Sequence, residues 1–121
     1  AKEYEPYQQE VYRLYEVLGQ ETGAIPTIPS PLNSRKFTDK ETNEQYYFTN
    51  EEVNNMLETL GKERQVLMKD LINQDWYKEY TDEDKLTEFE YIYKTTSKDG
   101  AWKEMYDKYV EKAKQENRLA K

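Results

Sequence analysis

Apolar side chains recur at i, i+3, i+4 and i+7 near the start of the chain: Val11, Leu14, Tyr15 and Leu18. This spacing is typical of the buried face of an amphipathic helix. Gly19 follows as a natural residue just past a helix end, and Pro6 is tolerated because it falls in the first turn. The pattern predicts a helix over residues 4–18.

A proline-containing segment follows, with glycine and prolines at Gly23, Pro26, Pro29 and Pro31. Prolines this dense exclude a helix and a central strand, so we expect an extended run. Residues 34–48 are ambiguous, because 35–38 and 45–48 either pair as a short β-hairpin or remain irregular. In both cases we expect residues 20–48 to wrap over the helices.

Thr49 is placed to cap a helix, with Glu52 three residues later to complete a reciprocal capping box. Phe48 before the cap is suited to pack against Val53 as a hydrophobic staple. The stripe behind this cap is Val53, Met56, Leu57 and Leu60. We expect this helix to stop or kink at Gly61, and a second helical pattern to cover residues 63–73.

The second half of the chain predicts two more helices separated by a weak point. A short aromatic connector at residues 76–80 precedes Thr81, which is suited to cap a helix whose first turn is acidic. That helix should weaken near residues 95–100. The last pattern, over residues 101–113, is the clearest amphipathic signal in the chain.

Together these patterns predict a single domain over residues 1–121 that is mostly α. We expect a small four-to-five-helix domain with a Pro-rich extended segment. Residues 34–48 either form a short β-hairpin or stay irregular. Trp102 should be the central core ring. The expected core is Leu14, Leu18, Leu57, Leu60, Leu67, Leu71, Phe89, Trp102, Met105 and Tyr109.

Composition complicates this picture, because the chain is poor in aliphatic residues and strongly acidic. Leu, Ile, Val and Phe make up less than a fifth of its 121 residues, and the net charge is -7, a combination typical of disordered chains. Against it stand 12 Tyr, 3 Phe and 2 Trp. Each aromatic ring buries about 150–250 Å², so aromatic residues can replace more numerous aliphatic ones.

Candidate chemistry is sparse. The chain has no Cys and no His, which removes thiol chemistry and the commonest general base and metal ligand. No GxxxxGK[ST], GxGxxG, GxSxG or HExxH string occurs, and neighbouring carboxylates such as Glu51 and Glu52 are explained by helix capping. We therefore predict no catalytic residues, no cofactor-binding residues and no metal site, and we expect that the protein is not an enzyme.

The same features restrict the partner. An acidic body repels nucleic-acid phosphates, and the longest apolar runs are three residues, so we expect neither nucleic-acid nor membrane binding. We therefore expect the partner to be another protein, either a virion protein or a host protein. Tyrosine either completes a thin core or anchors a partner, and two aromatic sets are candidates for the second role. They are Tyr4, Tyr7 and Tyr12 near the start, and Trp76, Tyr77 and Tyr80 in the connector.

The chain also resembles a helical module of large bacteriophage and prophage structural proteins, including tape-measure-like and polyvalent virion proteins. The resemblance runs from about Glu10 to Ala113 and includes EVYRLYEVLG, the capped helix of FTNEEVNNMLETLG, LINQDWY and TDEDK. The stretch Ser97–Gly100 departs from the smoother helix of that pattern. These motifs are helix caps and stripes, so the resemblance implies no functional residues.

What the resemblance implies is a virion-associated interaction domain, located in the virion or the host cytoplasm. Since the chain begins at Ala1 rather than Met, we expect it to be one piece of a longer protein. The alternative is a free-standing regulatory or adaptor domain that binds a host protein through an aromatic, acidic surface. The sequence predicts no oligomeric state.

Overall fold

The computed structural model describes residues 3–22, 30–32 and 34–120. These residues form a mostly helical fold, as predicted, and residues 36–47 form a small antiparallel hairpin, which is one of the two alternatives that the sequence left open. In chain order the elements are α1 (Pro6–Thr22), β1 (Lys36–Thr38), β2 (Gln45–Tyr47), α2 (Asn50–Ile72), the 3-10 helix η1 (Asp75–Glu79), α3 (Asp82–Asp99) and α4 (Trp102–Gln115).

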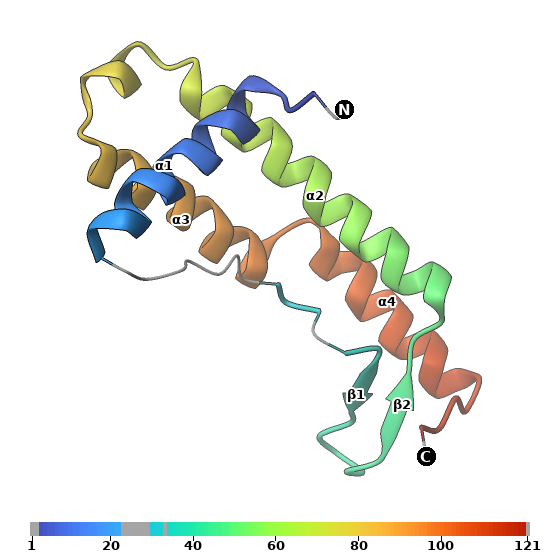
Figure 1. Cartoon of the computed structure of the whole chain (residues 1–121). Helices are drawn as coiled ribbons and strands as arrows, with labels where there is room; N and C mark the ends of the chain where they lie inside the picture. Colours follow the sequence, from blue (N-terminus) through green and yellow to red (C-terminus); the bar gives the residue numbers. More distant parts are fainter. Residues whose placement is uncertain (1–2, 23–29, 33, 121) are drawn as a thin grey trace.

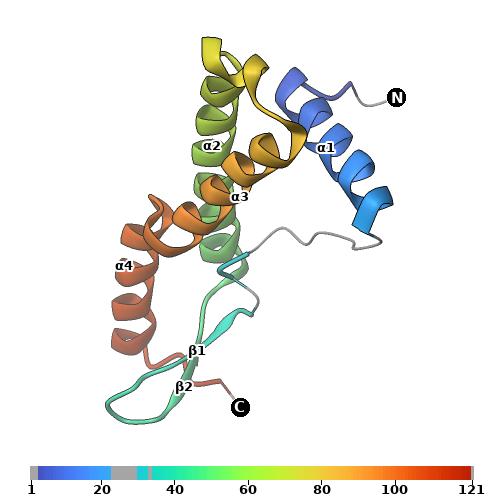
Figure 2. The ribbon, with the colours of Figure 1, turned by 90° about the vertical axis from the view of Figure 1, so that its left-hand side faces the viewer.

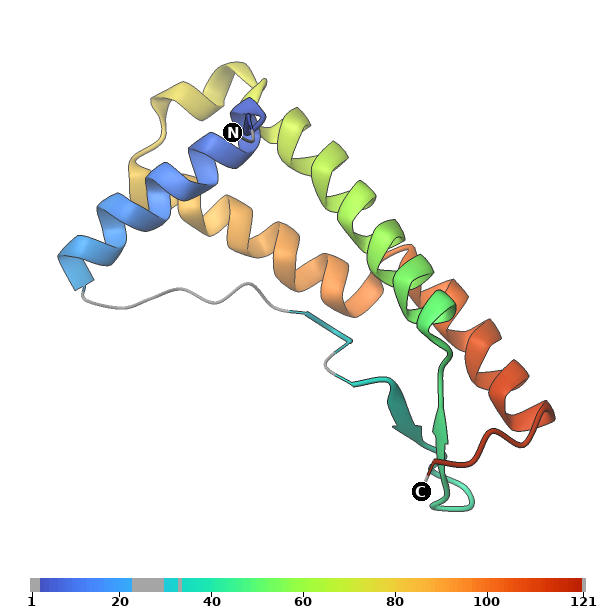
Figure 3. The ribbon, with the colours of Figure 1, turned by 45° about the vertical axis from the view of Figure 1, so that its right-hand side comes forward.

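Helix α2 is the axis of the molecule (Figure 1). Its 23 residues span about 35 Å at 1.5 Å per residue. Helix α3 packs against the second half of α2 and crosses it obliquely, whereas α4 runs antiparallel beside its first half (Figure 2). Figure 3 shows α1, η1 and α3 at one end of α2, and α4 with the hairpin at the other.

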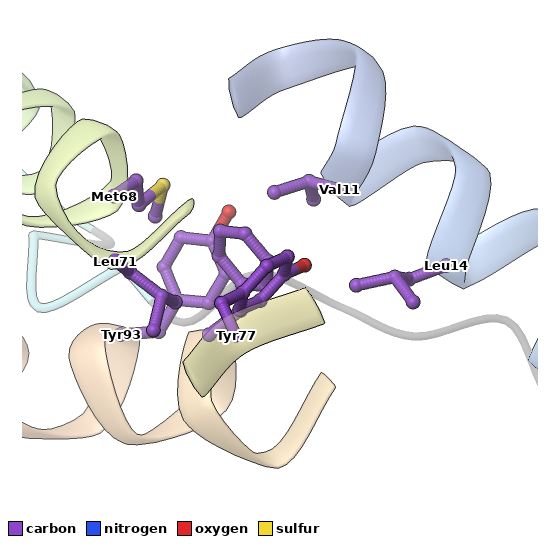
Figure 4. Packing of buried hydrophobic residues seen from close by; sticks show 7 residues of the cluster. Val11, Leu14, Met68, Leu71, Tyr77 and Tyr93 are labelled. Atoms are coloured by element: carbon purple, nitrogen blue, oxygen red, sulfur yellow. The ribbon is translucent and has the colours of Figure 1, made fainter. Parts of the chain in front are cut away.

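Two separate hydrophobic clusters hold this arrangement. The first comprises Val11, Leu14, Met68, Leu71, Tyr77, Phe89 and Tyr93. The second comprises Phe48, Met56, Leu60 and Trp102, with half-buried residues that include Leu32, Phe37, Val53 and Tyr106. Figure 4 shows the rings of Tyr77 and Tyr93 between α1 and the Met68 and Leu71 side chains of α2. Helix α2 contributes to both clusters.

The predicted caps are confirmed. The Thr49 hydroxyl accepts the Glu52 N–H at 3.1 Å, and the Glu52 carboxylate accepts the Thr49 N–H at 2.9 Å. Phe48 and Val53 belong to the same cluster, as expected of a staple. At α3 the Thr81 hydroxyl accepts the Asp84 N–H at 3.1 Å. Local sequence therefore determines where α2 and α3 begin.

Glu52 has a second role that the sequence patterns did not indicate. Asn117 adopts a positive φ of 54°, which reverses the chain after α4 and brings Arg118 back onto the start of α2. The buried Arg118 guanidinium then donates to both Glu52 carboxylate oxygens, at 2.6 and 3.0 Å. Beyond it, the Ala120 N–H donates to the Gln45 carbonyl at 2.8 Å, so the tail extends the sheet on the free side of β2.

The expected weak point before residue 100 is the junction between α3 and α4. The Thr96 carbonyl accepts both the Gly100 N–H at 3.1 Å and the Trp102 indole N–H at 2.7 Å. A Cβ atom on Gly100 would lie 2.3 Å from that carbonyl oxygen. Only glycine fits this close approach, and it allows α4 to start in a new direction.

Two predicted helix ends are wrong. Helix α1 continues past Gly19 to Thr22, and α2 runs without interruption through Gly61. A glycine inside a helix costs only about 1 kcal/mol, and packing on both sides of Gly61 offsets that cost. Residues 20–22, which were predicted to be extended, are therefore helical, and residues 23–29 and 33 of the predicted extended segment lie outside the described residues.

The predicted core is correct in part. Leu14, Leu60, Leu71, Phe89 and Trp102 are buried, and Leu18, Met105 and Tyr109 are half-buried. Leu57 and Leu67 were expected in the core, but each is 40% exposed. The reason is that the buried face of α2 shifts along the helix as its packing partner changes from α4 to α3.

We predict that Trp102→Ala destabilises the fold by about 3–5 kcal/mol and lowers the melting temperature by more than about 10 °C. Trp102 is only 4% exposed, and its indole caps the end of α3. Trp76→Ala is the matched control, because Trp76 is 41% exposed and should shift melting by a few degrees only. Thermal melts followed by circular dichroism measure both. If Trp102→Ala melts close to the wild-type temperature, the second cluster is not a source of stability.

The Glu52–Arg118 pair predicts a loss of stability in acid. Burial alone would raise the pKa of Glu52, but hydrogen bonds from Arg118 and Thr49 hold it below its ordinary value of 4.5. The carboxylate thus stabilises the fold above about pH 4.5, and this contribution disappears as pH falls through the lowered pKa.

Glu52→Gln should therefore cost about 3 kcal/mol at pH 7, since Arg118 loses its buried counter-charge, and progressively less as the pH falls through the lowered pKa of Glu52. Urea unfolding at a series of pH values measures this difference. The neighbouring exposed Glu51→Gln serves as the control. If the free energy of unfolding falls in parallel for wild type and Glu52→Gln as the pH is lowered, protonation of Glu52 is not linked to folding in this way.

Candidate functional site

The first predicted aromatic set lies on α1 and just before it. Tyr4 and Tyr12 are exposed, and their rings meet edge to face with centroids 5.1 Å apart. Tyr7 is half-buried and packs against the first cluster. The structure thus brings Tyr4 and Tyr12 together on the surface and turns Tyr7 partly inward.

A groove of about 200 Å³ lies between α1 and α2, beside this set. We call it the tyrosine groove. Its lining comes from α1, α2 and α3 and comprises Tyr7, Gln8, Val11, Tyr12, Gly61, Arg64, Gln65, Met68 and Tyr93. Buried Val11, Met68 and Tyr93 form an apolar floor, whereas the amides of Gln8 and Gln65 are each hydrogen-bonded to Glu5. An apolar floor with a few polar groups around it is typical of a binding site.

The phenol groups of the groove are available as hydrogen-bond donors. Within the described part of the chain, the hydroxyls of Tyr7, Tyr12 and Tyr93 have no hydrogen-bond partner. Burial raises the pKa of Tyr7 and raises that of Tyr93 to about 12, so both hydroxyls keep their protons at neutral pH. A bound segment with exposed carbonyl groups could therefore accept hydrogen bonds from them.

Arg64 stiffens the wall of the groove formed by α2 and α3. Its Nε donates to the Thr96 hydroxyl at 2.9 Å, and its Nη2 donates to the Ser97 hydroxyl at 2.8 Å and to the Tyr93 carbonyl at 3.2 Å. The guanidinium also lies 5.0 Å from the centre of the Tyr93 ring. Since these acceptors lie in the last turns of α3, Arg64 also complements the negative end of that helix.

Gly61 leaves the α2 side of the groove open. A Cβ atom at this position would meet nothing within 4 Å, so the absence of a side chain is not required by packing. The missing side chain leaves the backbone of α2 at Gly61 accessible to a bound molecule. The helix thus carries an unfavourable residue at a groove-lining position.

Tyr77, in the second predicted set, is buried and belongs to the core. Its hydroxyl donates to Glu10 at 2.5 Å, and Glu10 also accepts from Arg13 at 2.6 Å. Arg13 in turn pairs with Asp82 at the start of α3 at 3.0 Å. Burial and the bond to Glu10 raise the pKa of Tyr77. This network fixes α1 to η1 and α3, so Tyr77 is not available to a partner.

Trp76 and Tyr80 differ from Tyr77, because both are on the surface. They are 41% and 37% exposed, and their ring centroids lie 4.9 Å apart with a tilt of 43°. We call them the η1 aromatic pair. The connector predicted as one aromatic set therefore divides into a buried anchor and an exposed pair.

Within residues 3–22, 30–32 and 34–120, no three acidic side chains are grouped so that they could hold a metal ion. No helix in this described part is long and apolar enough to cross a membrane. Comparisons of the chain with protein-family models, with curated proteins and with solved structures give no match.

Sequence reasoning missed the part of the groove that α2 and α3 supply. The sequence pattern predicts a stop or kink at Gly61, and it gives no role in a binding site to Arg64, Met68 or Tyr93. The signal that could have identified the position is a glycine within an otherwise continuous helical pattern. Which residues face it across the groove depends on helix packing, and the sequence alone does not specify that.

We predict that Gly61→Ala stabilises the free protein by about 0.5–1 kcal/mol, because alanine favours the helix and the added methyl group meets open space. Urea unfolding at neutral pH measures the change. Gly100→Ala should have the opposite effect, since its methyl group would collide with the Thr96 carbonyl. A destabilised Gly61→Ala variant would mean that α2 needs glycine for its own packing.

Proposed function

We propose that this chain is a non-catalytic protein-interaction module of a phage or prophage virion-associated protein, and that it contacts its partner through the tyrosine groove. The observation that carries the proposal is the groove itself. It combines an apolar floor, free phenol hydroxyls and an open glycine in the middle of a helix. Aromatic side chains supply most of the binding energy in many protein interfaces.

The resemblance to helical modules of phage structural proteins supports the virion setting. The capped start of α2 and the Thr81 cap of α3, which carry much of that resemblance, are helix boundaries in the structure. A chain assembled with other structural proteins needs contact surfaces rather than a catalytic centre. The groove fits that requirement.

The alternative is a regulatory or adaptor domain that binds a host protein through an aromatic, acidic surface. The observation that favours it is the η1 aromatic pair, which lies among exposed carboxylates of η1 and the start of α3. Gene neighbourhood distinguishes the two settings. Flanking capsid, portal or tail genes support the virion module, and a metabolic operon would count against it.

The groove is tested with three variants. Tyr12→Ala removes an exposed wall and Gly61→Leu fills the open side, so each should weaken binding to a partner by at least about tenfold. Tyr91→Ala is the matched control, because Tyr91 is an exposed aromatic residue of α3 outside the groove. Calorimetric titration against separately purified structural proteins encoded by neighbouring genes measures the affinities.

The melting temperature of each variant is recorded first, so that loss of binding is not confused with loss of folding. Equal affinity for wild type, Tyr12→Ala and Gly61→Leu would exclude the groove as the contact surface. Weakening by Tyr91→Ala to the same extent would point to an unspecific aromatic effect and would also contradict the proposal.

A further inference from the structure

The η1 aromatic pair is held rigidly although it is exposed. Tyr77 lies between Trp76 and Tyr80 in the sequence and is anchored in the core by its bond to Glu10 and by an edge-to-face contact with Phe89 at 6.3 Å. The short helix therefore cannot rotate to bury Trp76 without breaking the first cluster. Aromatic rings already fixed at the surface lose little entropy when they bind.

The charge around this pair is negative. Asp75, Glu79, Glu83 and Asp84 are exposed, and none of these four carboxylates forms an ion pair with the described residues. By contrast, Asp82 is neutralised by Arg13. Residues three apart are eclipsed in a 3-10 helix, so Glu79 projects from the same side of η1 as Trp76. Lys78 is the exposed basic residue of η1.

We propose that the η1 aromatic pair is a docking site for an arginine-bearing or lysine-bearing segment of a partner protein. A cation above the face of Trp or Tyr is attracted by the ring, and nearby carboxylates add to the attraction. The same carboxylates repel phosphate groups, which disfavours nucleic acids and anionic lipid surfaces. The site adds a second contact surface to the proposed interaction module and is independent of the tyrosine groove.

The test uses the whole chain and a fluorescently labelled eight-residue peptide of alternating Arg and Gly, with a Glu and Gly peptide for comparison. Fluorescence anisotropy at low ionic strength measures affinity. Trp76→Ala and Tyr80→Ala should each weaken binding of the Arg peptide by at least about fivefold. The affinity of wild type should also fall as salt is added.

A matched pair of charge variants separates this site from general attraction to an acidic protein. Asp75→Asn with Glu79→Gln removes two charges beside Trp76, and Glu104→Gln with Asp107→Asn removes two exposed charges from α4. The first double variant should lose several-fold in affinity and the second should not. Because Trp76 and Tyr80 are exposed, melting temperatures should confirm that all variants fold.

Three results would overturn the proposal. One is an equal loss of affinity for the Arg peptide in the two double variants, which indicates unspecific charge attraction. Another is unchanged binding by both Trp76→Ala and Tyr80→Ala. A third is self-association of wild type that Trp76→Ala abolishes while the peptide does not bind, which assigns the surface to a second copy of the chain. Tyr12→Ala should leave peptide binding intact, so failure of the groove proposal remains distinguishable.

Discussion

The fold depends on the continuity of α2. The two hydrophobic clusters share this helix, and α3 and α4 meet it in succession on either side of the junction at Gly100. A kink at Gly61 would rotate Met68 and Leu71 away from the first cluster while Met56 and Leu60 stayed in the second. The glycine weakens the helix by about 1 kcal/mol, so other contacts must hold it straight. The capping box at its start and the bonds from Arg64 to the end of α3 provide these contacts on the two sides of Gly61.

Tyrosine explains how a chain with so few aliphatic residues folds. Tyr46, Tyr77 and Tyr93 are buried, and each adds a large ring to a core that leucine and valine alone would leave incomplete. Two of these three buried phenols donate to a carboxylate, Tyr77 to Glu10 at 2.5 Å and Tyr46 to Glu44 at 3.1 Å. The third, Tyr93, lines the tyrosine groove. The same residue type is exposed at Tyr4 and Tyr12, where no core demands it. Composition alone does not distinguish these two uses, although they have opposite consequences for stability and binding.

What the sequence predicted correctly is mostly local. The caps at Thr49 and Thr81 and the break at Gly100 depend on residues a few positions apart, and the hairpin depends on two nearby strands. The errors arise where packing decides. Leu57 and Leu67 match the helical stripe, but the buried face of α2 changes along its length, and a fixed period cannot follow that change. The Glu52–Arg118 pair joins residues 66 positions apart and depends on the turn at Asn117, so no periodic pattern reveals it. The same limit applies to the tyrosine groove, which three helices build together.

The buried ion pair and the two proposed recognition surfaces lie in different parts of this molecule. The buried ion pair, the capping box and Trp102 belong to the end formed by α4 and the hairpin, whereas both aromatic surfaces belong to the end formed by α1, η1 and α3 (Figure 3). The link from Glu10 through Tyr77 and Arg13 to Asp82 fixes η1 and α1 relative to each other, so it holds both aromatic surfaces in place without occupying either. Exposed residues such as Tyr12 and Trp76 can therefore change without removing a contact on which folding depends. Exposed residues with that freedom can adapt to a partner, and this is the physical basis for seeking recognition there rather than around the buried Glu52–Arg118 pair.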